Sequence, residues 1–323
     1  MAIKSSFYWR LALSSVLFLV GCQSKPKKTA TTPRFRPPQV GQNEAPRPMI
    51  GEEEPDEEPQ TPPPPAPETP KKVAVILGPG GAKTFAHVGV LKIFQQQRIP
   101  IHKVIGLEWG ALIGGIYASK GQVNDLEWKL YKMDQLNLPY PKGLFSKKPG
   151  EETVKVMSNY LKDVFGRDDV TRARVTFSCP TRSVWSGVVA WQSKGPFSDV
   201  VRRCLPYPPT FKVQGSFVAG ASQVTDAIDR LAKEGYNVII FVNVLGSAMP
   251  VDKNALVDNL NNVILWQEVK RNLAFADAYG IETVTVDTSE FSIMNFEHKK
   301  DLVSLGERVG QQAAQKLIEK YHF

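Results

Sequence analysis

The sequence contains few of the residues that build metal centres, and its charges do not form a nucleic-acid surface. Only three cysteines and four histidines occur in 323 residues. His102, His298 and His322 have no partner at ligand spacing, so we expect no metal and no other cofactor. No run of lysine and arginine is interleaved with aromatic residues, which argues against nucleic acid as a partner. The apolar stretch Leu11–Val20 is about half as long as a membrane-spanning helix requires.

The N-terminus instead contains the pattern of an export signal. Basic residues precede Leu11–Val20, which has the length of a signal h-region. The stretch ends in Leu19-Val20-Gly21-Cys22, which resembles the lipobox of bacterial lipoproteins. The resemblance implies that residues 1–22 are a lipoprotein signal peptide and that acylated Cys22 anchors the chain to a membrane of the cell envelope. Gln23 and Ser24 lack the aspartate associated with inner-membrane retention, which favours the outer membrane. An ordinary secretory signal with a chance cysteine is the alternative.

Residues 23–72 form a segment that we expect to be disordered. They contain 14 of the 25 prolines, including Pro62–Pro65, and almost no large apolar side chains. Such a segment buries too little surface to offset the entropy of ordering it. A proline-rich chain is semi-rigid, at about 3.1 Å per residue, so the segment is suited to be a tether that holds a domain off a membrane. Recognition of the proline run by a peptide-binding partner is the alternative.

Residues 73–323 predict one α/β domain, because strand-like and helix-like apolar periods alternate along them. Short or unbroken apolar runs predict strands, and apolar spacings of three and four residues predict helices between them. This alternation predicts a three-layer α/β/α fold with a mostly parallel sheet. The expected strands are Val73–Leu77, Val104–Gly106, Val238–Val244 and Ile281–Val286, and the expected helices begin at Phe85, cover Gly110–Ala118, Thr225–Glu234 and Ala255–Ala278, and close the chain near Lys320.

The charge and the cysteines of this domain leave alternatives open. Residues 73–323 carry 30 Lys and Arg against 24 Asp and Glu. This mildly basic balance suits an anionic membrane surface, and it suits a solvated surface without a partner equally well. Cys179 and Cys204 can pair in an exported protein, or they can lie unpaired in the interior.

A first glycine-rich turn, Gly78–Thr84 (GPGGAKT), follows the first expected strand. It is not a Walker A loop, because Ala82 and Leu77 occupy positions that require glycine. It is not a dinucleotide fingerprint either, because Lys83 stands at the third glycine. Its consecutive glycines leave backbone N–H groups free to converge on an anion at a helix start, as in an oxyanion hole. A tight strand–helix connection without chemistry is the alternative for this turn alone.

A second turn, Gly106-Leu107-Glu108-Trp109-Gly110, has the spacing of the G-x-S-x-G nucleophile elbow. Together the two turns resemble the patatin-like phospholipases. Four ordered blocks carry the resemblance over residues 73–323: LGPGGAKTFAHVGVL (77–91), VIGLEWGALIGGIYA (104–118), VRRCLPYPPTF (201–211) and FVAGA (217–221). The resemblance implies a lipid acyl hydrolase fold in which an elbow serine attacks an ester and an aspartate acts as its base.

Both catalytic positions of that family are changed here. Glu108 stands at the serine position and Ala219 at the aspartate position, and no other G-x-S-x-G occurs in the chain. The oxyanion loop keeps Gly80 and Gly81 but has Pro79 for a glycine, Lys83 for the usual arginine and Thr84 for the next glycine. We therefore expect an inactive pseudo-phospholipase that binds a lipid, an acyl group or a protein partner. A hydrolase with a non-standard nucleophile is the alternative, and we expect a structural role for His87.

The sequence also predicts where Glu108 lies and what it does. Between the elbow glycines Gly106 and Gly110, Glu108 should lie on a tight turn from a strand to a helix, with Ala219 facing it. Its carboxylate should fill the oxyanion hole, bind the N–H groups of Gly80 and Gly81 and gain a charge-assisted bond from Lys83. Such contacts would lower its pKa. A Glu108 that points into solvent from a decayed site is the alternative.

Overall fold

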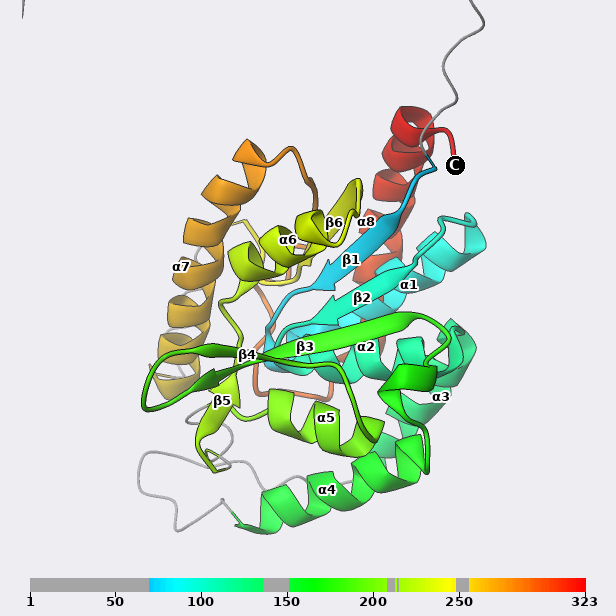
Figure 1. Cartoon of the computed structure of the whole chain (residues 1–323). Helices are drawn as coiled ribbons and strands as arrows, with labels where there is room; N and C mark the ends of the chain where they lie inside the picture. The colour runs from blue at the N-terminus through cyan, green and yellow to red at the C-terminus, as the bar shows by residue number, and fades with distance from the viewer. Residues whose placement is uncertain (1–69, 136–150, 208–212, 214, 248–255) are drawn as a thin grey trace, which may run out of the picture. The chain divides into compact units, whose positions relative to one another are not determined.

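A computed structural model of the chain describes residues 70–135, 151–207, 213, 215–247 and 256–323. It confirms the expected α/β alternation (Figure 1). The four strands expected from apolar runs are present as β1 Val73–Leu77, β2 Lys103–Gly106, β6 Val238–Asn243 and β7 Glu282–Thr285. The signal peptide, Cys22 and all but the last three residues of the tether lie outside the described residues.

These strands belong to one seven-stranded sheet with the order β4-β3-β2-β1-β6-β7. Strands β3 Thr176–Ser183, β2, β1, β6 and β7 are parallel, whereas β4 Val189–Gln192 and β5 Phe217–Ala219 run antiparallel to β3. The sheet is therefore mostly parallel, as expected.

Helices cover both faces of the sheet, which gives three layers. Successive side chains of a strand point to opposite faces, and those of β1 divide accordingly. Val73, Val75 and Leu77 pack with the helices of one face, whereas Ala74 and Ile76 pack with those of the other. The first face carries α1 Ala86–Gln96, α2 Trp109–Lys120, α3 Val123–Tyr131, α4 Glu151–Phe165, α5 Phe197–Cys204 and α8 Lys299–Tyr321; the second carries α6 Val224–Lys233 and α7 Leu256–Ala278.

The sequence did not predict strands β3, β4 and β5 or helices α3, α4 and α5. Strand β3 (TFSCPTRS) is neither an unbroken apolar run nor a regular alternation, and it contains Pro180. The structure also shows whether the two cysteines are paired, which the sequence left open. Cys179 in β3 and Cys204 at the end of α5 form a disulfide, with Cα atoms 6.2 Å apart.

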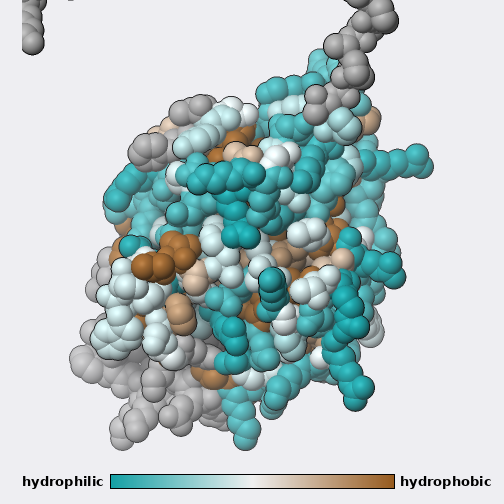
Figure 2. Space-filling view, viewed as in Figure 1, coloured by the Kyte–Doolittle hydropathy of each residue, from teal (hydrophilic) through white to brown (hydrophobic). Residues whose placement is uncertain are grey.

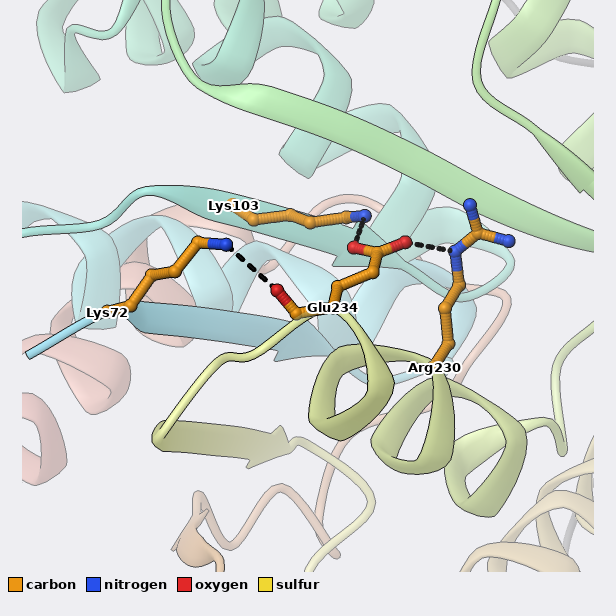
Figure 3. Close-up of polar contacts among 4 residues, drawn as sticks. All are labelled: Lys72, Lys103, Arg230 and Glu234. Atoms are coloured by element: carbon orange, nitrogen blue, oxygen red, sulfur yellow. Dashed lines mark hydrogen bonds and ion pairs between the residues drawn. The ribbon is translucent and has the colours of Figure 1, made fainter.

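A polar network fastens the start of the domain at the amino end of the sheet (Figure 3). The Glu234 carboxylate accepts a hydrogen bond from Lys103 Nζ and pairs with Arg230 Nε at 2.9 Å. Lys72 Nζ donates to the backbone oxygen of Glu234 at 2.9 Å. Burial lowers the pKa of Lys103, so Glu234 is the partner that keeps this buried lysine charged.

Among the residues that the structure describes, no helix is both long enough and apolar enough to cross a membrane.

Candidate functional site

Glu108 lies on a tight turn between a strand and a helix, as predicted. Strand β2 ends at Gly106 and α2 begins at Trp109, with Glu108 as the residue that precedes the helix. Its backbone has φ 53° and ψ −122°, a conformation that costs a non-glycine residue roughly 1–3 kcal/mol. A sharp, strained strand-to-helix turn of this kind is the geometry of a nucleophile elbow.

The glycines on either side let this turn close against β1. A Cβ atom at Gly106 would lie 2.3 Å from the Cα of Ala111, and one at Gly110 would lie 2.4 Å from the backbone oxygen of Leu77. Both distances are far below van der Waals contact with backbone atoms that cannot move aside. The spacing of the two glycines is therefore required by the turn itself.

The glycine-rich loop after β1 lies opposite the elbow and directs backbone N–H groups towards it. Gly80 and Gly81 have φ angles of 154° and 55°, which side chains rarely adopt. Their N–H groups donate to Glu108 Oε2 over 3.0 Å and 3.1 Å. From the other side, the loop is closed by the backbone oxygen of Ile293, which accepts a hydrogen bond from Ala82 N at 2.8 Å.

The Glu108 carboxylate therefore accepts hydrogen bonds from both of the N–H groups that were expected to form an oxyanion hole. Its residue is only 3% exposed, so the alternative of a side chain swung into solvent is wrong. The N–H donors of Gly80 and Gly81 are satisfied within the chain.

The expectation that the pKa of Glu108 is lowered is wrong. Burial raises the pKa of this carboxyl to about 7, although hydrogen bonds from the backbone of Gly80, Trp109 and Gly81 favour its charged form and lower it. Removal from water outweighs the three donors, because the side chain is enclosed on all sides. Lys83 is fully buried in the short 3-10 helix η1 Gly81–Phe85. A charge-assisted bond from Lys83 to Glu108 stays a prediction.

Ala219 lies on the side of β3 that faces the elbow. Thr181 and Arg182 of β3 pair with both β4 and β5, so these two strands lie on opposite edges of β3. Strand β2 pairs with β3 on the edge away from β4, and therefore β5 continues beyond the end of β2. Ala219 is the residue at which β5 approaches that end. Alanine has no group that could accept a proton there.

Tyr207 is a neighbour of Glu108 that the sequence motifs did not identify as a site residue. Burial raises the pKa of its hydroxyl, and the negative charges of Glu268 and Glu108 raise it further. The preceding residue, Pro206, accepts a hydrogen bond from Ala219 N at 2.6 Å. The only sequence signal for Tyr207 was its position inside the block 201–211, which gave no reason to single it out.

His87 supports the glycine-rich loop from within the core. Its Nε2 lies 2.8 Å from the backbone oxygen of Gly78, and the side chain is fully buried. Burial lowers its pKa to about 4, so the ring is neutral at physiological pH and donates a hydrogen bond to Gly78. This geometry agrees with the structural role expected for His87. The described residues include no group of three or more His, Cys, Asp or Glu side chains that could hold a metal ion.

Comparison with known proteins places this geometry in a family. The model of the patatin-like phospholipases matches residues 75–232, which include the glycine-rich loop, the elbow and β5. Lysophospholipase nte1 of Neurospora crassa is 23% identical over 290 residues, covering 77% of this chain and 19% of the relative. An uncharacterized NTE family protein of Mycobacterium bovis is 20% identical over 202 residues, covering 60% of this chain and 56% of the relative. The chain thus spans a fifth to just over half of these relatives.

Among solved structures, VipD from Legionella pneumophila matches with a TM-score of 0.40 and 11% identity, covering 78% of this chain and 67% of the other. The type III effector protein ExoU matches with a TM-score of 0.36 and 13% identity, covering 76% and 53%. These similarities are too low to add to the comparison of sequences. The family match covers both turns of the site and agrees with the parallel three-layer fold. Residues 75–232 thus form a patatin-like phospholipase domain.

Proposed function

We propose that this protein is an envelope-anchored, catalytically inactive pseudo-phospholipase that binds a lipid or acyl ligand or a protein partner. The observation that carries the proposal is the position of the Glu108 carboxylate, which accepts hydrogen bonds from Gly80 and Gly81 N–H. Those donors would otherwise stabilise the oxyanion of ester hydrolysis. Glu108 thus replaces the nucleophile and also blocks the oxyanion hole.

The second catalytic group is missing as well. Ala219 stands where the family has its aspartate base, and it cannot take a proton. Removing one member of a catalytic triad typically slows a reaction by about 10⁴- to 10⁶-fold. The loss of both groups leaves the fold without its route to an acyl-enzyme.

The disulfide supports the proposed location. Bonds such as that between Cys179 and Cys204 persist in oxidising compartments and are rare in the cytosol. This agrees with export by the signal peptide and with an anchor at Cys22. Loss of labelled palmitate from the Cys22→Ser variant in growing cells would test the anchor. Labelling that persists in this variant would disprove it.

Activity is tested with the purified chain and a short-chain p-nitrophenyl ester, with and without a serine-reactive fluorophosphonate. We expect no hydrolysis by the unaltered chain and partial recovery in the double variant Glu108→Ser, Ala219→Asp. Glu108→Ser alone is the matched control, because it restores the nucleophile without the base. Mass spectrometry of lipid extracted from the purified protein tests ligand binding.

A working hydrolase is the second candidate, because one observation favours it. A buried carboxyl with a pKa of about 7 has the proton affinity of a general base near neutral pH. Glu108 could then activate a water instead of acting as a nucleophile. Clear ester hydrolysis by the unaltered chain, abolished by Glu108→Gln, would establish this candidate and overturn the inactive one.

A further inference from the structure

Exposed apolar side chains gather at one place on the surface. The face shown in Figure 2 is largely hydrophilic, with apolar residues in a few separate places. Seven large apolar side chains are exposed among the described residues, and four of them belong to the β3–β4 hairpin and the start of β5. These four, called the hairpin patch here, are Val184, Trp185, Val188 and Phe217. Trp185 is 85% exposed, which is unusual for tryptophan, the largest of the side chains.

Backbone hydrogen bonds hold the patch in place. Ser183 N donates to Val188 O at 2.9 Å, and Gly187 N donates to Ser183 O at 3.0 Å, which closes the hairpin turn. Val184 N donates to Ser216 O at 2.9 Å and ties the turn to the start of β5. Phe217 is paired with Ser183 across the two strands. The patch is therefore a fixed feature of the sheet.

A cationic cavity lies beside the patch. It has a volume of about 440 Å³ and is lined by Gln192, Arg202, Arg203, Gly215, Ser216 and Phe217. Phe217 belongs to both the cavity and the hairpin patch, so the two are continuous. Arg203 Nη1 donates to Gln192 Oε1 at 3.3 Å. Arg202 pairs with Asp199 at 3.6 Å. Among the described residues that line the cavity, two are arginines and none is acidic, so its lining is cationic.

The patch and the cavity lie at the same end of the sheet as the elbow. Strand β3 is parallel to β2, so its carboxyl end and that of β2 point the same way. The hairpin follows the carboxyl end of β3, and Glu108 follows that of β2. A surface that contacts the hairpin therefore lies at the end of the sheet that also carries Glu108.

We propose that the hairpin patch and the arginine cavity dock the folded domain onto a bilayer that contains anionic phospholipid. Tryptophan favours the boundary between water and lipid, because its ring is apolar and its N–H is polar. Arginine binds phosphate through parallel N–H donors. The patch enters the interface while Arg202 and Arg203 bind phosphate headgroups. This contact is separate from the anchor at Cys22 and does not depend on whether the site is active.

The test measures binding of the full chain to vesicles, with Cys22→Ser in every protein so that no acyl anchor contributes. The vesicles contain equal parts of phosphatidylglycerol and phosphatidylcholine, or phosphatidylcholine alone. The hairpin variant is Trp185→Ser, Val188→Ser, and its control is Trp128→Ser, another exposed tryptophan. The arginine variant is Arg202→Gln, Arg203→Gln.

The control for the arginine variant is Arg172→Gln, Arg174→Gln, which removes two exposed charges before the amino end of β3. Each basic residue near an anionic surface contributes about fivefold in partitioning, so we expect the arginine variant to bind about 10- to 30-fold more weakly. We expect a loss of at least about tenfold for the hairpin variant, from its lost apolar burial. The controls should bind as the parent does, and phosphatidylcholine alone should bind weakly.

Quenching by doxyl-labelled lipid reports on the hairpin directly. We expect vesicles with this lipid to quench part of the tryptophan fluorescence, and Trp185→Phe to remove that part while Trp128→Phe leaves it. Unchanged quenching in Trp185→Phe, or equal binding by the hairpin variant and its control, overturns the proposal. The proposal is also overturned if millimolar inorganic phosphate releases the parent protein from vesicles while the hairpin variant binds them fully. That pair of results would mean that the arginines bind a soluble anion. None of these results would alter the inactivity proposed for Glu108.

Discussion

The raised pKa of Glu108 in the folded protein should make the free energy of unfolding fall as the pH rises towards neutrality. The carboxyl is buried, and its pKa is raised from 4.5 to about 7. Glu108→Gln is the informative substitution, because glutamine has nearly the same size. It still offers an oxygen to the N–H groups of Gly80 and Gly81, but it cannot ionise.

The sign and the size follow from the difference between the folded and unfolded chains. Below pH 4.5 both states hold the Glu108 proton, and the group does not affect unfolding. Between pH 4.5 and about 7 the unfolded chain releases the proton while the folded chain keeps it, so the free energy of unfolding falls. A pKa difference of this size corresponds to about 3 kcal/mol, at about 1.4 kcal/mol per pH unit. About one pH unit above this pKa the loss is complete, and it then stays constant.

Urea unfolding followed by tryptophan fluorescence, at about pH 5 and about pH 8, measures this difference. We expect the unaltered chain to lose about 2 to 3 kcal/mol more than Glu108→Gln between these conditions. His87, whose pKa is lowered to about 4 by burial, has the opposite effect and destabilises the fold as the pH falls below 6.5. It is present in both proteins, so it cancels in the comparison. Parallel pH profiles for the two proteins would refute a raised Glu108 pKa.

Two further substitutions test other features of the fold. Glu234→Gln should lower the free energy of unfolding by about 1 to 3 kcal/mol, because it weakens the pairing of the buried Lys103, whose side chain is 5% exposed. The matched control is Glu307→Gln, whose partner Lys92 is 32% exposed. It should cost less than about 1 kcal/mol. Equal costs in urea unfolding would show that the buried lysine does not need its partner. Replacing Cys179 and Cys204 by serine opens a loop with a sequence separation of 25 and should cost about 3 kcal/mol. The unaltered protein, alkylated without reductant, should show neither cysteine labelled, and labelling of both would disprove the disulfide.

The strands at the centre of the sheet and the position of the elbow could be predicted from local sequence. Strand β1 and the inner strand β6 are buried on both faces. Their sequences VAVIL and VIIFVN are therefore apolar throughout, apart from Asn243 at the end of β6. The elbow could be predicted because Gly106 and Gly110 are required by contacts within a few residues and with β1. Such sequence patterns arise from contacts with residues nearby in the sequence and with the adjacent strand.

Strand β3 and the disulfide depended on contacts between distant segments. Strand β3 has Pro180 where its pairing with β2 gives way to pairing with β5, a mixed environment that leaves no regular apolar pattern. Cys179 and Cys204 meet because α5 packs on β3. Neither partner could be identified from the residues around the other.

The Glu108 site shows both sources of information. The sequence alone determined that a glutamate stands at the elbow. The resemblance to the patatin-like phospholipases implied that Ala219 stands at the position of the base, and it predicted the hydrogen bonds from Gly80 and Gly81 because the family's oxyanion donors converge at the elbow. Only the tertiary structure decided the direction of the Glu108 pKa and the exposure of Trp185. A pKa depends on how completely the surrounding protein removes water from a group. Exposure likewise depends on what packs against a side chain, and neither is written in the residues next to it.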